Sequence, residues 1–197
     1  MRVDLKENEL WILSFYRNSE INGSLFFGRM ARTLPPGPVQ HDMTRHFADE
    51  GQHAWFWTSC IQRLGAEPIR LDETYQDRYL AAAGLPTNIM EILAITLTFE
   101  KRVIGQYALH RKMPGLRMQV RETIDLIMED EKWHIEWVSE ALERLKPEFG
   151  ADRIESTLKR FHDADQEVYR SILEEHHQRL EDLLKHRART RQDDDAV

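Results

Sequence analysis

The sequence predicts an all-α protein, a four-helix bundle followed by one further helix. Over four long segments apolar residues recur at alternating spacings of three and four, the period of one face of an amphipathic helix. Proline and glycine interrupt this pattern at residues 34–38, 65–86 and 113–115. Because two of these breaks are short and the middle one is long, we expect two helical hairpins joined by a crossover.

The first hairpin pairs a helix predicted over residues 4–33 with one over residues 39–64. The segment between them, LPPGP at 34–38, contains three prolines and cannot continue a helix. The second helix is expected to stop at Gly65. Its inward face carries Met43, His46, Glu50, His53, Trp57, Cys60 and Leu64.

The connection over residues 65–86 is long enough to span the bundle. A helix of about 25 residues is about 37 Å long, and the 22 residues of this connection can cover that distance as mostly extended chain. The second and third long helices should then run parallel. In that arrangement the two short turns lie at opposite ends of the molecule.

The second hairpin begins after Pro86, where Thr87 is the expected N-cap. Its first helix is predicted to run to about residue 112 and to end at Met-Pro-Gly. Its second helix is predicted over residues 117–146. Together the two hairpins predict one bundle domain over residues 1–148.

The C-terminal segment, residues 149–188, is predicted as an amphipathic fifth helix, strongest from Ala151 to about Arg187. Its apolar face is sparse, so packing on the bundle is favoured, and pairing with a second subunit in a homodimer is the alternative. The last residues, 189–197, are polar and are expected to form a disordered tail.

Composition excludes several classes of function. The 197 residues carry a formal net charge of -7, which argues against nucleic-acid binding. The single cysteine, Cys60, cannot form an internal disulfide or a thiolate metal cluster. Without an apolar run of about 18–20 residues or a signal-peptide pattern, no membrane association is expected. We therefore expect a cytoplasmic protein.

Two Glu-x-x-His motifs belong to a longer internal repeat. The segment DEGQHAWF at 49–56 matches DEKWHIEW at 130–137, so Asp-Glu-x-x-His followed by an aromatic residue occurs twice at a shift of 81 residues. A third motif, Glu174 to His177, lacks the preceding Asp and any matching hairpin. We attribute this third motif to coincidence.

The upstream helices of the two hairpins match as well. At a shift of 80 residues, Glu20 aligns with Glu100 and Phe27 aligns with Tyr107. Each copy therefore contains a Glu in the middle of one helix and an Asp-Glu-x-x-His on the returning helix. This regularity indicates a duplicated helical hairpin whose polar residues share one purpose.

Metal binding would explain these inward polar residues. Glu and His three apart on a helix lie on one face and can reach the same ion. Four buried carboxylates without partners would be prohibitively costly, whereas two cations would neutralise them. Mixed carboxylate and imidazole ligation suits iron or manganese. The predicted ligands are Glu20, Glu50, His53, Glu100, Glu131 and His134.

This ligand pattern resembles that of the ferritin-like di-iron carboxylate superfamily, in which two helices each supply a Glu and two others each supply Glu-x-x-His. The resemblance covers residues 4 to about 146. It implies two iron ions, with manganese or a mixed manganese–iron pair as alternatives, and bridging carboxylates at Glu50 and Glu131. It pairs Glu20 with His53 on one ion and Glu100 with His134 on the other.

The residues around the ligands have predicted roles of their own. A metal-bound His usually donates its other N–H to a carboxylate. In similar di-iron proteins the Asp before each Glu serves the His of the opposite helix. We therefore predict contacts of Asp49 with His134 and of Asp130 with His53. Tyr107 is a further predicted neighbour of the ligands.

The sequence lacks features that are typical of two subfamilies, the rubrerythrins and the bacterioferritins. Rubrerythrins have Glu-x6-Tyr on both upstream helices, but here Phe27 stands where the first Tyr would be, and Val103 replaces an additional ligand. Although rubrerythrin-related in its ligands, the chain is therefore not expected to be a rubrerythrin peroxidase. Gly51 occupies the position of the haem-binding Met of bacterioferritin.

With these subfamilies set aside, the six-ligand pattern resembles that of oxygen-activating enzymes such as aldehyde-deformylating oxygenase and the tRNA-modifying hydroxylases. The resemblance implies an oxidoreductase that uses dioxygen or peroxide, with an external electron donor, on a small substrate. A ferroxidase or iron-storage protein and a non-catalytic helical bundle are the alternatives.

Three inward positions carry open or secondary interpretations. Gly23 and Thr96 are small enough to leave room for dioxygen or substrate, but close helix packing explains them equally well. For His46, one turn before Glu50, a hydrogen-bonded core histidine is favoured over an outer ligand or proton relay.

Overall fold

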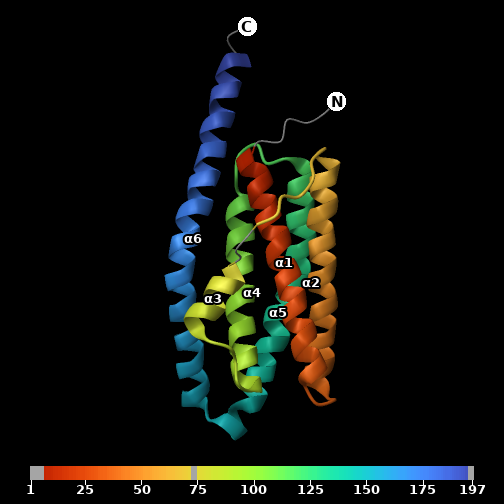
Figure 1. Ribbon diagram of the computed structural model, residues 1–197, viewed down its shortest axis with the longest axis vertical. Helices are drawn as coiled ribbons and strands as arrows, with labels where there is room; N and C mark the ends of the chain where they lie inside the picture. The colour runs from red at the N-terminus through yellow and green to blue at the C-terminus, as the bar shows by residue number, and fades with distance from the viewer. Residues whose placement is uncertain (1–6, 72–74, 195–197) are drawn as a thin grey trace.

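In the computed structural model, residues 7–71 and 75–194 are described, and all regular structure in these ranges is helical (Figure 1). Side chains of the last helix are described as far as residue 170 and at three positions beyond it. The helices are α1 (Glu7–Thr33), α2 (Pro38–Arg63), α3 (Tyr75–Ala83), α4 (Ile89–Arg111), α5 (Met118–Phe149) and α6 (Ala151–Asp194).

Four long helices, α1, α2, α4 and α5, surround a common core, and α6 lies along the outside (Figure 1). The turn between α1 and α2 and the turn between α4 and α5 lie at opposite ends of the molecule, and α2 and α4 run in the same direction (Figure 1). Pro38 stands in the first turn of α2, where its missing N–H costs no hydrogen bond. Gly65, with φ of 80°, follows the end of α2.

The connection between α2 and α4 differs from the expected extended chain, because it contains α3. Tyr75 and Tyr79 stand one turn apart on α3 and are both buried. The Tyr79 hydroxyl donates a hydrogen bond to the carbonyl oxygen of Phe161 at 2.9 Å, and its ring packs 4.9 Å from that of Phe99. The short helix forms because α4 and α6 bury these two rings, a partnership that a nine-residue pattern does not reveal.

The start of α4 also differs from the prediction, since Asn88 rather than Thr87 is the N-cap. Asn88 has an extended backbone, and its side-chain oxygen accepts a hydrogen bond from the Glu91 N–H at 3.0 Å. The Glu91 carboxylate reaches back and accepts a hydrogen bond from the Thr87 N–H at 2.8 Å. This exchange resembles a capping box displaced by one residue.

The C-terminal helix packs on the bundle, as the favoured interpretation predicted. Ile154, Phe161 and Val168 of α6 are all buried. α5 continues past residue 146 to Phe149, and Gly150 (φ 84°) separates it from α6. The helix extends through residues 189–194, where a disordered tail was predicted. Residues 195–197 lie outside the described part of the chain.

The apolar core consists of two clusters, one toward each end of the bundle. One contains Ile12, Tyr16 and Trp57, and the other contains Phe27 and Met43. In both clusters each of these residues is at most 1% exposed. At about 25 cal/mol per Å² of apolar surface removed from water, these two clusters are the main stabilising contribution that the fold contains. On α1, α2 and α5 the predicted ligands lie between the two clusters in sequence.

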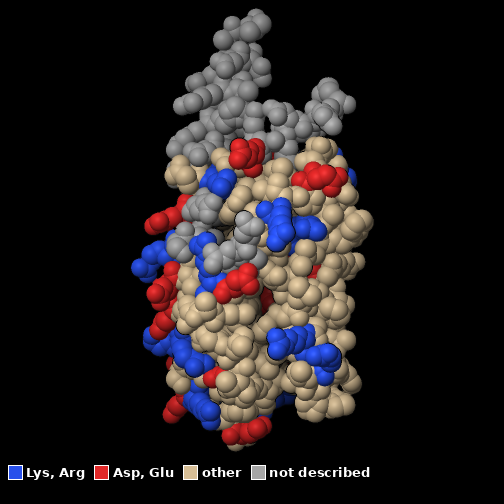
Figure 2. Space-filling view, viewed as in Figure 1, with Lys and Arg blue, Asp and Glu red and all other residues tan. Residues whose placement is uncertain are grey.

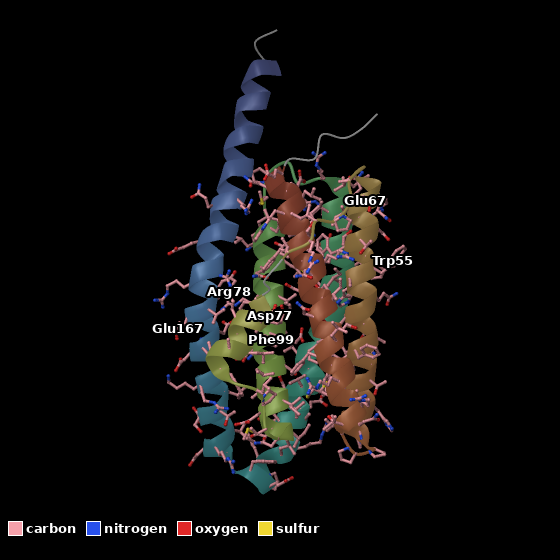
Figure 3. All side chains as sticks on the ribbon, viewed as in Figure 1. Trp55, Glu67, Asp77, Arg78, Phe99 and Glu167 are labelled. Carbon is pink, nitrogen blue, oxygen red and sulfur yellow. The ribbon has the colours of Figure 1, made fainter. Side chains whose placement is uncertain are left out.

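The surface is charged but has no dominant sign in the view of Figure 2, where residues of both signs follow each other along α6. Trp55 of α2 projects from the outer side of the bundle and is 60% exposed (Figure 3). None of the helices in the described ranges is long and apolar enough to cross a membrane.

Candidate metal centre

The structure brings all six predicted ligands together inside the bundle. Each is at most 5% exposed, and each of the four long helices contributes at least one. α1 and α4 each supply one carboxylate, whereas α2 and α5 each supply a carboxylate and an imidazole one turn apart. They are Glu20 of α1, Glu50 and His53 of α2, Glu100 of α4, and Glu131 and His134 of α5.

One group of potential ligand atoms comes from Glu20, Glu50, His53 and Glu131, whose nearest atoms lie within 4.8 Å of one another. His53 Nδ1 lies 3.7 Å from Glu20 Oε2 and 3.5 Å from Glu131 Oε1. Three carboxylates and one imidazole therefore converge on a single point.

A second group combines His46, Glu50, Glu100 and His134 within the same limit. His134 Nδ1 lies 3.7 Å from Glu50 Oε1 and 3.8 Å from Glu100 Oε2. Glu50 belongs to both groups. Two adjacent ion positions that share a carboxylate are the arrangement found in two-metal sites.

Glu131 also lies between the two groups. Its Oε1 lies 3.5 Å from His53 Nδ1, and its Oε2 lies 3.2 Å from His134 Nδ1. One carboxylate oxygen thus faces each histidine. The bridging role that the resemblance implied for Glu131 stays a prediction.

Each histidine of the repeated motifs contacts an aspartate of the opposite helix. His53 Nε2 lies 3.2 Å from Asp130 Oδ2, and His134 Nε2 lies 3.4 Å from Asp49 Oδ2, which is the crossed pairing that the sequence predicted. Burial raises the pKa of Asp49, but the hydrogen bond and charge of His134 outweigh it and lower that pKa. Both aspartates hold Nε2 and leave Nδ1 toward the centre.

Tyr107 of α4 contacts the ligand set directly, because its hydroxyl donates a hydrogen bond to Glu20 Oε1. Trp57 Nε1–H donates to the Tyr107 oxygen at 2.9 Å. Burial, followed by the negative charge of Glu20, raises the pKa of Tyr107 well above its usual value. The phenol therefore keeps its proton and orients Glu20.

The space beside Gly23 is filled by the Glu50 side chain of α2. A Cβ at this position would lie 3.2 Å from Glu50 Cδ and would overlap Glu50 Oε2. The Glu50 carboxylate therefore fills the space beside Gly23. Thr96 is also fully buried, and its hydroxyl donates a hydrogen bond to the Ile92 carbonyl oxygen at 2.8 Å.

His46, which the sequence places one turn before Glu50, lies among the predicted ligands. Its Nε2 lies 3.0 Å from Glu100 Oε1 and 3.3 Å from Glu50 Oε1. Neither ring nitrogen has an aligned hydrogen-bond partner among the described residues. The polar contacts of His46 are therefore with two of the predicted ligands. Burial lowers the pKa of His46, which favours the neutral imidazole that can act as a ligand.

The electrostatics of the centre favour added positive charge. Burial, and then neighbouring carboxylates, raise the pKa of Glu50 and Glu131 well above the usual value. Burial alone would lower the pKa of His53, but Glu20 and then Glu131 raise it to about 10. Protons or metal ions must therefore compensate the buried carboxylates.

Two polar atoms at the centre lack an aligned hydrogen-bond partner. Within the described residues, His53 Nδ1 and Glu131 Oε1 are buried without a hydrogen-bond partner. Buried polar atoms normally have one. A nitrogen and a carboxylate oxygen that face one point without a mutual hydrogen bond fit a shared cation, so the residues present suit a metal pair.

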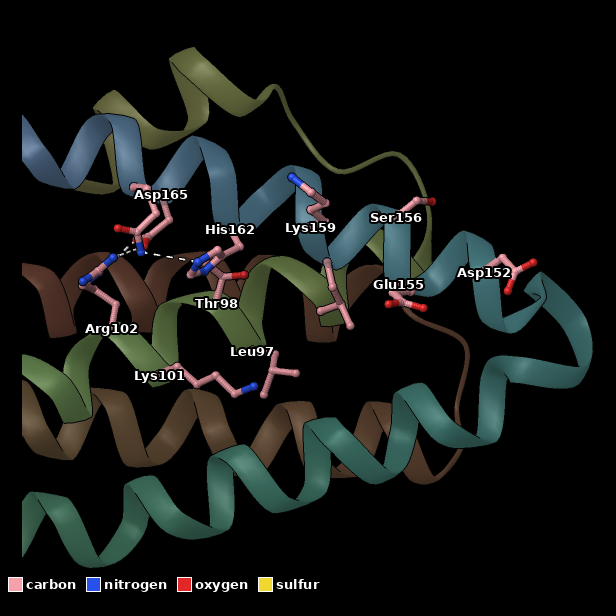
Figure 4. A pocket seen from close by; sticks show the side chains of 12 residues that line it. Leu97, Thr98, Lys101, Arg102, Asp152, Glu155, Ser156, Lys159, His162 and Asp165 are labelled. Carbon is pink, nitrogen blue, oxygen red and sulfur yellow. Dashed lines mark hydrogen bonds and ion pairs between the residues drawn. The ribbon is translucent and has the colours of Figure 1, made fainter.

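A groove with a volume of about 780 Å³ lies elsewhere, between α4 and α6 (Figure 4). At its inner end Arg102 Nε donates to Asp165 Oδ1 at 3.0 Å, and the hydroxyl of Tyr75 donates to the same carboxylate. This buried network joins α3, α4 and α6. None of the six predicted ligands lines the groove, so it contributes to helix packing rather than to the centre.

Comparison with known proteins adds no relative: no protein-family model, no curated protein and no solved structure matches the chain. The chemical interpretation of the centre therefore depends on its own geometry. That geometry consists of two adjacent groups of buried ligand atoms, contributed by α1, α2, α4 and α5.

Proposed function

We propose that this protein is a ferritin-like four-helix bundle that binds two first-row transition metal ions. The observation that carries the proposal is the pair of adjacent ligand groups that share Glu50. Carboxylate and imidazole ligands suit iron, with manganese or a mixed manganese–iron pair as alternatives. The long connection between α2 and α4, which run in the same direction, supports the ferritin-like arrangement (Figure 1).

In this proposal Glu50 and Glu131 would hold both ions, because each reaches atoms of both groups. Glu20 and His53 complete one ion position. Glu100 and His134 complete the other. The four carboxylates then balance the charge of two divalent cations, and their burial becomes tolerable.

We further propose an oxidoreductase that uses dioxygen or peroxide and an external electron donor on a small substrate. A bound iron pair supplies the redox chemistry. The chain contributes a dry site, since the apolar residues Trp57 and Phe27 are buried on the helices that carry the ligands. Tyr107 holds a proton at its hydroxyl oxygen beside Glu20. Asp49 and Asp130 hold the protons on Nε2 of the two histidines.

Reconstitution of the full-length chain tests the proposal. Protein stripped with a chelator should bind two Fe²⁺ per chain under anaerobic conditions, measured by elemental analysis. On admission of air it should develop the near-ultraviolet absorption of an oxo- or carboxylate-bridged ferric pair. With an artificial electron donor it should consume oxygen catalytically.

A matched pair of variants identifies the site. Glu131→Ala should bind fewer than one Fe²⁺ per chain. Glu174→Ala should bind as the wild type does, because Glu174 is exposed and belongs to the unrepeated third motif. If the wild-type protein binds no metal, the proposed function is wrong and the alternative of a non-catalytic helical bundle stands. Uptake of many ferric ions per chain would instead identify a ferroxidase or storage protein.

A further inference from the structure

The two hairpins repeat the six ligands, but they differ at one buried position. His46 lies four residues before Glu50, and at the shift of 81 residues its counterpart is Ile127, four residues before Glu131. Both side chains are fully buried. An apolar residue suits this core position without further partners, whereas a buried imidazole needs polar partners. His46 therefore requires an explanation that Ile127 does not.

The contacts of His46 indicate a ligand rather than a hydrogen-bonding residue. Its Nε2 lies 3.0 Å from Glu100 Oε1 and 3.3 Å from Glu50 Oε1, but it is not aligned to donate to either oxygen. The ring is stacked on that of His134, with centroids 3.7 Å apart. His46 Nε2 and His134 Nδ1 thus both face the position bounded by Glu50 and Glu100.

A second difference between the hairpins lies beside the first. The Tyr107 hydroxyl donates to Glu20, but the equivalent residue of the first hairpin is Phe27, which has no hydroxyl for Glu100. The Phe27 ring instead packs against His46, with centroids 4.0 Å apart. On this side of the centre His46 occupies the place beside the carboxylate that Tyr107 has on the other.

We infer that His46 is a seventh metal ligand, so that the two ion positions differ. One position has two imidazoles, from His46 and His134, with the carboxylates of Glu50 and Glu100 and the shared Glu131. The other has one imidazole, from His53, and three carboxylates. Since nitrogen ligands favour the later first-row divalent metals and carboxylates favour manganese, the position beside His46 should bind Co²⁺ more tightly. The inference deepens the proposed function and rests on it.

The three histidines differ in whether the ring nitrogen that faces away from the centre has a hydrogen-bond partner, and this difference predicts how strongly each one holds its ion. Asp130 and Asp49 hold Nε2 of His53 and His134, but His46 Nδ1 has no hydrogen-bond partner within the described residues. Such outer contacts typically contribute 10–100-fold to metal affinity. Loss of His46 should therefore weaken its ion position less than loss of His134 does.

Titration of the chelator-treated full chain with Co²⁺, followed by visible absorption, tests the inference. The wild type should bind two ions per chain in two steps that differ by at least about 10-fold in affinity. His46→Ile, which introduces the residue found at position 127, should weaken only the tighter step, by about 100-fold. His134→Ala should weaken the same step further. His53→Ala should weaken the other step.

Two controls separate ligation from packing. His110→Ala removes another buried histidine, outside the ligand groups, and should leave both steps unchanged. In His46→Ala, added imidazole should fill the space left by the side chain and restore the tighter step together with its absorption band. This second variant also provides the test if His46→Ile does not fold.

The outcomes distinguish this inference from the function on which it rests. If the wild type binds no Co²⁺, the proposed metal centre fails and the inference fails with it. If the wild type binds two ions, and both His46 variants keep both steps within about threefold while His134→Ala loses one, only the assignment of His46 is overturned.

Discussion

The hairpin formed by α1 and α2 and the hairpin formed by α4 and α5 each carry three equivalent ligands, but the neighbours of these ligands differ. Where the first hairpin has Gly23, the second has Val103 at the shift of 80 residues. At Gly23 of α1 the Glu50 carboxylate of α2 occupies the position that a Cβ would take. The repeat therefore supplies two similar sets of ligands, and the differing neighbours make the two ion positions inequivalent.

The largest expected effect distinguishes a ligand that belongs to both groups from a ligand that belongs to one group only. Because Glu50 belongs to both groups, Glu50→Ala should reduce the metal content from about two ions per chain to near zero. Glu20 belongs to one group only, so Glu20→Ala should leave about one ion. Elemental analysis after reconstitution measures both. Equal metal loss in the two variants would contradict the shared role of Glu50.

Substitution of Asp49 or Asp130 should weaken metal binding at one ion position at a time. Asp130→Asn should weaken the ion held by His53, and Asp49→Asn the ion held by His134, each by about 10–100-fold. The physical reason is the loss of the charge that makes each imidazole a stronger donor to the metal. Competition titrations with a chromophoric chelator measure the affinities. An identical effect of both variants on a single step would show that the crossed pairing does not determine which ion is affected.

Gly23 and Gly105 differ in the space around them, so an alanine at each position should have the opposite effect on stability. Gly23→Ala should destabilise the fold by about 1–3 kcal/mol, because the new Cβ displaces the Glu50 carboxylate. Gly105→Ala is the matched control on α4, where no atom lies within 4 Å of a new Cβ. It should stabilise the fold by up to about 1 kcal/mol through helix propensity. Urea unfolding of both metal-free variants measures these free energies.

The smallest expected effect comes from making the hairpins alike at one position. Tyr107→Phe introduces the residue found at position 27 and removes the hydroxyl that contacts Glu20 and Trp57. The free energy of unfolding should fall by about 1–2 kcal/mol, since the buried Trp57 N–H loses its acceptor. Thermal unfolding measures the change. The metal content should stay at about two ions, because no ligand is removed.

The six predicted ligands were accessible from the sequence because two local rules act together. Helical period places Glu50 and His53 on one face, and the repeat shows that Glu131 and His134 were placed in the same way. The crossed contacts of Asp49 and Asp130 followed from the resemblance, and the structure has both. These features depend on spacing within a helix and on a symmetry that can be read along the chain.

Other features required the assembled molecule. α3 was missed because Tyr75 and Tyr79 are buried only when α4 and α6 cover them. The cap of α4 is Asn88 rather than Thr87, because the Glu91 N–H donates to the Asn88 side chain while the Glu91 carboxylate accepts from Thr87.

By itself the sequence determined the long helices, the duplicated hairpin and the set of inward Glu and His residues, since all of these follow from periodicity. Only the tertiary structure decided what His46 contacts and why position 23 is a glycine. Position 46 has no polar counterpart in the repeat, and its neighbour Glu100 lies on a different helix. Periodicity states which face a residue occupies, but the distance between atoms of different helices is set only when the helices pack.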